Sequence, residues 1–322
     1  TIEYTITIPS KNFEESYSSV LKDHTKDLDM KGFRKGQVPE DIIKTNMGDT
    51  IKYETFEKLA PLYVNTTLMK EKVNPIVPPA YKEIPQIEAG KDIVFTVIVT
   101  VMPEFKLGNL KKIKVEKKEI KVDDKEVDSS IEELKKTQKT GEMNINDTWA
   151  KEVAKNIGLE KINSLEDLKK LIKDSLKGQK EHLALHEYQD KILEEAVKIS
   201  KIQIPDVAVK YEASERENTF IYEMKQRGVD IKDFLKTQNI TIEKMREMWE
   251  KDAKEALEAD TLLNIYAKEK SVSISEDELN KKIEEIKKGQ GDARNDIYSN
   301  PQWREYVKNV ETKTKAFNML ME

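Results

Sequence analysis

The second half of the chain carries apolar residues at helical spacing almost without interruption. From Ser164 onward they recur three and four positions apart, and Ser164 and Ser275 are each followed three residues later by an acidic residue, as at helix N-termini. Charged residues make up 36% of the chain and the mean hydropathy is -0.70, so the surface is large relative to the interior. These patterns predict an elongated, all-helical domain over residues 146–322.

The N-terminal part has a different pattern. Residues 2–8 alternate apolar and polar side chains and residues 93–101 are β-branched almost throughout, so both segments indicate strands. Helical spacing occurs between them in three segments, residues 10–21, 39–47 and 51–72. Pro61 is expected to kink or divide the last of these helices. The order predicts a small α+β domain, residues 1–110, in which helices cover one face of an antiparallel sheet.

Residues 31–39, which we call the tip loop, separate the first two predicted helices. Its glycines permit a tight turn, and Pro39 fixes the direction in which the chain leaves. The residues expected to face a partner are Lys31, Gly32, Phe33, Arg34, Lys35 and Gly36. An exposed Phe fits a partner with a pocket, and Arg and Lys fit phosphates or carboxylates. The alternative is an ordinary turn with solvated charges and Phe33 folded back into the core.

The tip loop and the residues after it resemble a known signature. The run Gly-Phe-Arg-Lys-Gly-x-Val-Pro, followed by Asp41-Ile-Ile-Lys and then Gly48, is similar to the ribosome-binding signature of trigger factor, a family of bacterial ribosome-associated chaperones. The resemblance implies an ATP-independent chaperone that docks near the nascent-chain exit of the ribosome and holds unfolded or newly made polypeptides. It also implies C-terminal helical arms like those of SurA-type chaperones, and it allows a homodimer away from the ribosome.

Trigger factor chains normally carry an FKBP-type prolyl isomerase domain between their N- and C-terminal domains. Here residues 111–122 alternate apolar and charged positions as an extended linker strand, residues 123–134 have the capping box and spacing of a helix, and residues 138–146 lose periodicity. Residues 111–145 therefore predict a linker without room for an inserted domain. We expect no prolyl isomerase activity and no other catalysis.

Charge and hydropathy limit the partners and the location. A net charge of -5 opposes general affinity for nucleic acid, so contact with ribosomal RNA has to be local, at the tip loop. The longest apolar stretch, residues 93–102, is too short to cross a bilayer, and no signal-peptide pattern opens the chain. The chain has no cysteine, which fits a reducing compartment. We expect a cytoplasmic protein whose partners are the ribosome and unfolded polypeptides, without a membrane partner.

The sequence gives weak support for metal or cofactor chemistry. His182 and His186 stand four residues apart on one predicted helix face, a spacing that zinc sites use. Leu183 occupies the position where an HExxH motif needs glutamate, and His24 is the one other histidine in the sequence. No phosphate-binding loop, dinucleotide fingerprint or nucleophile elbow occurs. We expect a structural or solvated role for the histidine pair, with no metal and no cofactor.

Apolar residues of the predicted arms are the candidates for client binding. Methionine repacks around irregular shapes, which suits the binding of varied unfolded chains. The candidates are Met224, Met245, Met248 and Trp249. Most residues at helical spacing form core, so we expect most of the apolar arm residues to pack between helices and the remainder to line a cradle. The residues leave open a free-standing holdase, a scaffold for one folded partner, or residual prolyl isomerase activity.

Overall fold

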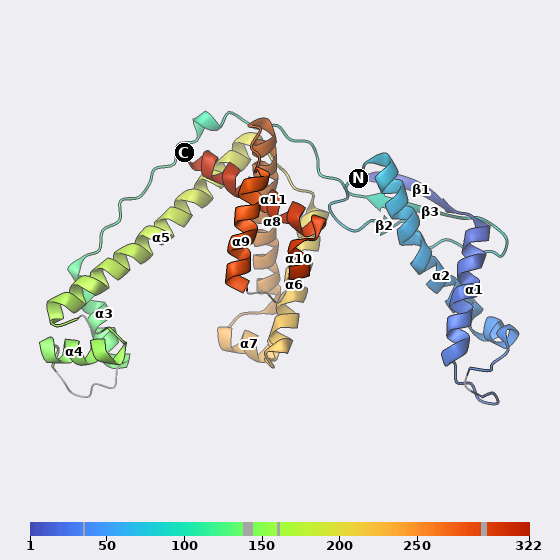
Figure 1. The fold of residues 1–322 in the computed structure, drawn as a ribbon, viewed down its shortest axis with the longest axis horizontal. Helices are drawn as coiled ribbons and strands as arrows, with labels where there is room; N and C mark the ends of the chain where they lie inside the picture. Colours follow the sequence, from blue (N-terminus) through green and yellow to red (C-terminus); the bar gives the residue numbers. More distant parts are fainter. Residues whose placement is uncertain (35, 138–143, 160–161, 291–294) are drawn as a thin grey trace. The chain divides into compact units, whose positions relative to one another are not determined.

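A computed structural model describes residues 1–34, 36–137, 144–159, 162–290 and 295–322 of the chain (Figure 1). The chain divides into two compact units. The first comprises residues 1–104 and 204–254, and the second comprises residues 105–203 and 255–322. In the described ranges, no helix combines the length and the apolar character needed to cross a membrane.

A three-stranded antiparallel sheet organises residues 1–104 (Figure 1). Strand β1 (Ile2–Ile8) pairs with β3 (Ile93–Val99) along its whole length, and the short β2 (Ala80–Tyr81) pairs with the other side of β3. Every second side chain of β3 is buried, because alternate side chains of a strand point to opposite faces. The predicted antiparallel sheet is confirmed.

Two helices, α1 (Ser10–Asp27) and α2 (Glu40–Glu71), complete the N-terminal fold. Their inward faces and the sheet share one core, whose buried residues are Ile6, Ile8, Phe13, Phe56, Ala60, Val64, Leu68, Ile93, Phe95, Val97 and Val99. The rings of Phe56 and Phe95 meet edge to face, with 5.1 Å between their centroids. Burying one side chain of this size contributes about 1.5–3 kcal/mol, so this cluster fixes α2 on the sheet.

The prediction of separate helices over residues 39–47 and 51–72 is wrong. Helix α2 runs without a break through Gly48 and Pro61. Pro61 is exposed, whereas seven residues of α2 are buried on its other side. A proline removes one backbone hydrogen bond from a helix, but here its ring lies toward solvent and does not disturb the packed face. Burial of that face therefore outweighs the local preferences of glycine and proline.

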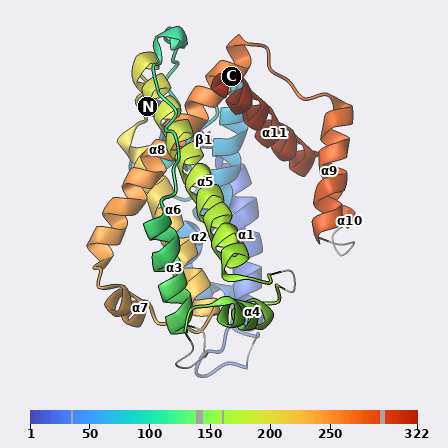
Figure 2. The same ribbon diagram turned by 90° about the vertical axis from the view of Figure 1, so that its left-hand side faces the viewer.

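Three helices of the second unit form a small core around one end of a long helix (Figures 1 and 2). They are α3 (Asp124–Thr137), α4 (Asp147–Asn156) and the long α5 (Leu165–Ser200). The buried residues of this core are Val127, Ile131, Trp149, Ala150, Val153 and Leu168. Trp149 is fully buried and is the largest of them. The core holds α3 and α4 on the N-terminal turns of α5.

Residues 204–254 contain α6 (Asp206–Gln226), α7 (Ile231–Gln238) and the first turns of α8 (Ile242–Glu269). Arg246 of α8 donates three hydrogen bonds to the carboxylate of Glu217 in α6, at 2.6, 2.9 and 3.1 Å. The rings of Phe220 in α6 and Phe234 in α7 meet with 5.4 Å between their centroids. No residue of α7 is buried. Aromatic and ionic contacts, with few buried side chains, therefore hold these helices together.

The C-terminal helices belong to the second unit and are α9 (Glu276–Gln290), α10 (Asn295–Tyr298) and α11 (Pro301–Met321). The predicted capping box at Ser275 is present, because Ser275 N donates to Glu278 Oε2 at 2.8 Å and Glu278 N donates to Ser275 Oγ at 3.2 Å. The bond from the Ser275 amide, together with Lys315, lowers the pKa of Glu278 to about 2. The prediction that the C-terminal part is helical is confirmed.

Candidate functional site

The tip loop lies between α1 and α2 and is held at both ends. Gly36 N donates to the carbonyl oxygen of Leu28 at 3.2 Å, which closes the loop across its base. Val38 is only 2% exposed, because it belongs to a small core under the loop. That core consists of Val20, Leu21, Val38, Ile43 and Ile51, with Leu28 and Met30 packed against it. Val38 therefore anchors the end of the tip loop, while the residues around it, including Phe33, Gln37 and Pro39, are exposed.

Two glycines set the path of the tip loop. Gly32 has φ of 99° and Gly36 has φ of 76°, in the left-handed region that other residues adopt at a cost. At Gly36 there is also little space, because a Cβ would lie 3.0 Å from the carbonyl oxygen of Lys26. At Gly32 a Cβ would meet nothing within 4 Å. The loop therefore needs glycine at position 36 for two reasons and at position 32 for one.

The middle of the tip loop presents apolar and basic side chains to solvent. Phe33 is 38% exposed, and Lys31 and Arg34 are exposed beside it. The amide of Phe33 donates to the carbonyl oxygen of Met30 at 3.0 Å, which fixes the turn that carries the ring. Lys35 lies outside the described residues. Phe33 thus faces solvent with two cations and is not folded back into the core.

Next to the tip loop, one polar contact joins α1 to α2 and one ion pair lies within α1. His24 Nε2 of α1 lies 2.5 Å from Glu54 Oε2 of α2. Lys26 Nζ lies 3.0 Å from Asp23 Oδ1, and the hydrogen bond and charge of Lys26 lower the pKa of Asp23. These carboxylates are paired with groups of α1 and α2. Within the described residues, neither Lys31 nor Arg34 takes part in an ion pair, so their charges face solvent.

The four predicted client residues differ in exposure. Met248 is 51% exposed, whereas Met224, Met245 and Trp249 are partly buried. The Trp249 ring packs against Phe220 of α6, with 5.6 Å between the ring centroids. Packing between α6 and α8 therefore occupies one face of Trp249, and Met248 is the most accessible of the four.

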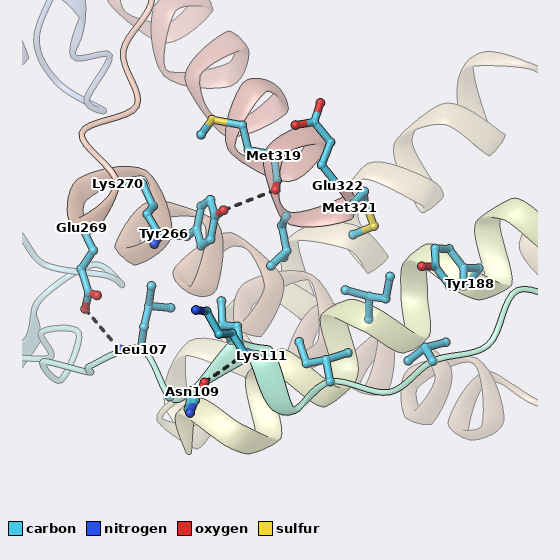
Figure 3. Close-up of a pocket in the computed structure, with 16 residues that line it drawn as sticks. Leu107, Asn109, Lys111, Tyr188, Tyr266, Glu269, Lys270, Met319, Met321 and Glu322 are labelled. Carbon is cyan, nitrogen blue, oxygen red and sulfur yellow. Dashed lines mark hydrogen bonds between the residues drawn. The ribbon is translucent and has the colours of Figure 1, made fainter.

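A groove within the second unit is a further candidate surface, which sequence analysis missed (Figure 3). Residues 107–115 form one wall, and α5, α8 and α11 form the others, around a volume of about 710 Å³. The apolar lining includes Leu107, Leu110, Ile113, Tyr266, Met319 and Leu320. Tyr266 Oη donates to the carbonyl oxygen of Met319 at 3.4 Å, which joins α8 to α11 beside the groove (Figure 3).

Residues 107–115 are held on these helices by backbone hydrogen bonds and by a close contact at Gly108. Gly108 N donates to Ser200 Oγ at 3.0 Å, and Leu107 N donates to Glu269 Oε1 at 3.3 Å. A Cβ at position 108 would collide with the side chain and carbonyl oxygen of Ile199. The predicted linker strand is wrong as an element, because the described residues from 105 to 123 contain one 3-10 turn (Leu110–Lys112) and no strand. The alternating apolar residues of this segment did indicate a buried face, but that face packs on helices and not on another strand.

Comparison with known families gives two matches. The model described as bacterial trigger factor protein (TF) matches residues 1–134, and the model described as bacterial trigger factor protein (TF) C-terminus matches residues 164–322. Between them they match both ends of the chain and leave residues 135–163 unmatched. The unmatched stretch overlaps the predicted linker, residues 111–145, at residues 135–145 and continues into the first helix predicted for the C-terminal domain.

Curated relatives are also trigger factors. Trigger factor from Clostridium botulinum (strain Loch Maree / Type A3) is 23% identical over 417 aligned positions, which cover 100% of this chain and 96% of the relative. Because the alignment is longer than the 322 residues of this chain, the relative has residues without a counterpart here. Trigger factor from Actinobacillus succinogenes is 38% identical over 135 residues, which cover 42% of this chain and 31% of the relative.

A solved structure has the same fold. It is a trigger factor chaperone studied for promiscuous substrate recognition in folding and assembly, and it aligns with 99% of this chain and 96% of its own at a TM-score of 0.56 and 18% identity. At this identity the likeness shows the fold alone. The family models, which match both ends of the chain, supply the assignment. The chain therefore belongs to the trigger factor family of ribosome-associated chaperones, in a form that lacks the middle prolyl isomerase region.

Proposed function

We propose that this protein is an ATP-independent chaperone that docks on the ribosome, near the nascent-chain exit, through its tip loop. The observation that carries the proposal is the exposure of Phe33 beside Lys31 and Arg34 on a loop held at both ends. An exposed aromatic side chain suits a pocket on a partner, and the neighbouring cations suit phosphates. A ribosomal surface offers both, because it is made of protein and RNA.

The charge of the whole chain supports docking at one point. The net charge is -5, so the rest of the molecule is repelled by RNA phosphates while the basic tip loop is attracted. Local attraction raises the rate of encounter, and burial of the Phe33 ring adds a specific contact that slows dissociation. The protein attaches by its tip loop and leaves its helical surfaces available to a nascent chain.

For clients we propose two apolar surfaces, the groove along residues 107–115 and the exposed Met248. Methionines lie in both, since Met319 lines the groove. Flexible side chains adapt to many sequences, and each contact is weak enough to be released. The sequence has no phosphate-binding loop motif, so release follows from folding of the client or from competition, without nucleotide hydrolysis.

The roles divide along the chain in three segments. Residues 1–110 dock, residues 111–145 link, and residues 146–322 hold clients. Residues 107–115, where the first two segments meet, also form a wall of the groove. Without the isomerase region, we propose that the protein does not catalyse prolyl isomerisation. A prolyl-peptide assay tests this point, because uncatalysed exchange takes tens to hundreds of seconds and any acceleration is readily seen.

Co-sedimentation with bacterial ribosomes at fixed, moderate salt tests the docking proposal. The test variant combines Phe33→Ala, Arg34→Ala and Lys35→Ala. The matched control combines Lys11→Ala, Leu62→Ala and Lys70→Ala, which also removes one exposed apolar side chain and two cations from the same domain. We expect the parent and the control to sediment with ribosomes and the tip-loop variant to remain in solution.

The outcomes separate docking from client holding. If the tip-loop variant and the control bind equally well, or if the parent does not bind, the docking proposal fails. Suppression of the aggregation of a chemically unfolded protein is then measured with the same three chains. Equal suppression by all three indicates a free-standing holdase, whereas no suppression by any of them contradicts the chaperone proposal as a whole.

A further inference from the structure

The middle of α5 carries a histidine pair that none of the proposed roles uses. In place of the solvated role expected from the sequence, we propose that His182 and His186 together chelate one divalent transition-metal ion, for which Zn²⁺ is the probe. Their Nε2 atoms lie 3.2 Å apart, and the centroids of their rings lie 4.3 Å apart. The nitrogens are thus closer than the rings that carry them. The two Nε2 atoms therefore lie on the facing edges of the rings, whose planes are inclined by 68°.

The separation of the two nitrogens matches a shared ion. Two nitrogens 3.2 Å apart, each about 2.05 Å from a Zn²⁺ ion, subtend about 103° at the ion. The tetrahedral angle that Zn²⁺ prefers is about 109°. The distance between the nitrogens therefore allows both to bind one ion when rotation of the exposed rings points their lone pairs at it. The spacing makes this arrangement possible, because residues four apart lie side by side on successive turns of a helix.

The proton count of the pair also favours an ion. A neutral imidazole has one N–H donor and one acceptor nitrogen, so two Nε2 atoms at this distance need a proton between them. Two facing lone pairs repel each other, and so do two facing N–H groups. A metal ion satisfies both lone pairs at once when each ring carries its proton on Nδ1. Binding to the neutral pair therefore needs one tautomer change, in which the ring that carries its proton on Nε2 carries it on Nδ1 instead and no net proton is released.

The surroundings leave the rest of the coordination shell open. Among the described residues, no third His, Cys, Asp or Glu completes a group around the pair. The carboxylates adjacent in sequence have lysine partners, because Glu187 lies 2.6 Å from Lys118 and Glu181 lies 3.7 Å from Lys177. Water or an external ligand fills the remaining positions. Open positions are typical of exchangeable or catalytic sites and not of closed structural ones.

Access to the pair is unobstructed. Both histidines are exposed, and Gly178 stands one turn before His182. Helix side chains lean toward the N-terminus, so the space next to His182 is the space over position 178. A Cβ at Gly178 would meet nothing within 4 Å. An ion with its water ligands can therefore approach the pair from solvent.

A calorimetric titration of the metal-free full chain with Zn²⁺ tests the proposal. We expect saturable binding of one ion per chain. His182→Ala and His186→Ala should each weaken binding by roughly a hundredfold, because a single imidazole loses the gain of simultaneous attachment. His24→Ala is the matched control, since His24 pairs with Glu54 on a different helix, and it should bind as the parent does.

Thermal unfolding provides a second measurement. An ion that binds the folded chain raises the melting temperature, so Zn²⁺ should shift the parent and the His24→Ala variant but neither α5 variant. Circular dichroism without metal shows whether each variant keeps its helices. Unchanged affinity in the α5 variants, or no saturation of the parent below millimolar Zn²⁺, overturns the proposal. One ion per two chains overturns it as well and assigns the pair to a bridge between copies.

Discussion

The tip loop and residues 107–115 are both irregular segments, but they are held in opposite ways. The tip loop is closed by a bond between Gly36 and Leu28, eight positions apart, and by two residues of positive φ. Residues 107–115 are held by partners distant in sequence, since Leu107 bonds Glu269 and Gly108 bonds Ser200. The first segment is shaped by its own sequence. The second takes its shape from the helices on which it lies.

Among the substitutions that test this comparison, Gly108→Ala should lower the free energy of unfolding most. The new Cβ would collide with the side chain and the carbonyl oxygen of Ile199, and the backbone cannot yield as a flexible side chain does. We expect a loss of about 3 kcal/mol in the free energy of unfolding, measured by urea denaturation. Hydrogen exchange should show faster exchange at the amides of residues 107 and 108, with the sheet of residues 1–104 unchanged.

A double variant serves as the control for Gly108→Ala. Removal of the Ile199 side chain in Gly108→Ala/Ile199→Ala relieves the collision with that side chain and leaves the collision with the carbonyl oxygen. The two changes should therefore be non-additive, with part of the Gly108→Ala loss recovered. If the losses of the two single variants add exactly, a Cβ at position 108 does not contact the Ile199 side chain. The close contact described for residues 107–115 would then be wrong.

Replacing either glycine of the tip loop by alanine should lower the free energy of unfolding by less than Gly108→Ala does. Gly36→Ala introduces both a positive φ and a Cβ contact of 3.0 Å with the Lys26 carbonyl oxygen, so we expect a loss of about 2 kcal/mol. Gly32→Ala introduces the positive φ alone, for which we expect about 1 kcal/mol. Urea denaturation of the two variants side by side measures the difference. Equal losses would contradict the role assigned to the Lys26 contact.

Glu278 is held both by a neighbour in the chain, Ser275, and by a residue distant in sequence, Lys315. Its pKa is lowered from 4.5 to about 2 by the Ser275 amide within the capping box and by Lys315 of α11. A lowered pKa contributes stability above pH 4.5, and that contribution is lost as the pH falls toward 2. In Glu278→Gln the amide can keep the cap bond without the charge. The excess melting temperature of the parent over this variant should therefore shrink between pH 4.5 and 2.

Calorimetric scans of parent and Glu278→Gln across this pH range measure the excess. Other carboxylates titrate in both chains, so the difference between the chains isolates Glu278. Lys315→Ala then separates the two restraints, because it removes the distant partner and leaves the capping box intact. A constant difference between parent and Glu278→Gln at every pH would show that the carboxylate charge contributes nothing to the fold.

The same contrast explains what sequence could predict. The strands at residues 2–8 and 93–101, the capping boxes and the glycine-bounded tip loop have clear local patterns, and the structure contains them, with the second strand ending at Val99. The alternation over residues 111–122 has a similar local pattern, but no neighbouring strand pairs with it in the described residues. The continuity of α2 depends on burial against the sheet, which spacing around Gly48 and Pro61 does not reveal. The groove requires α5, α8 and α11 to come together around residues 107–115. In those segments the apolar pattern was visible, but the surface it packs against was not.

Gly178→Ala should change the free energy of unfolding least, and it is the reference for the other glycine substitutions. It lies inside α5, its φ is not positive, and a Cβ there would meet nothing within 4 Å. Neither restraint acts on it, so alanine should stabilise the protein by about 0.5–1 kcal/mol through its higher helix propensity. Urea denaturation measures the gain, and Zn²⁺ affinity should be unchanged because a methyl group is too small to cover the histidine pair. If Gly178→Ala instead destabilises the protein as much as Gly36→Ala does, alanine is unfavourable at glycine positions in general. Positive φ in the tip loop and the close contact at Gly108 would then no longer explain the differences among the glycine variants.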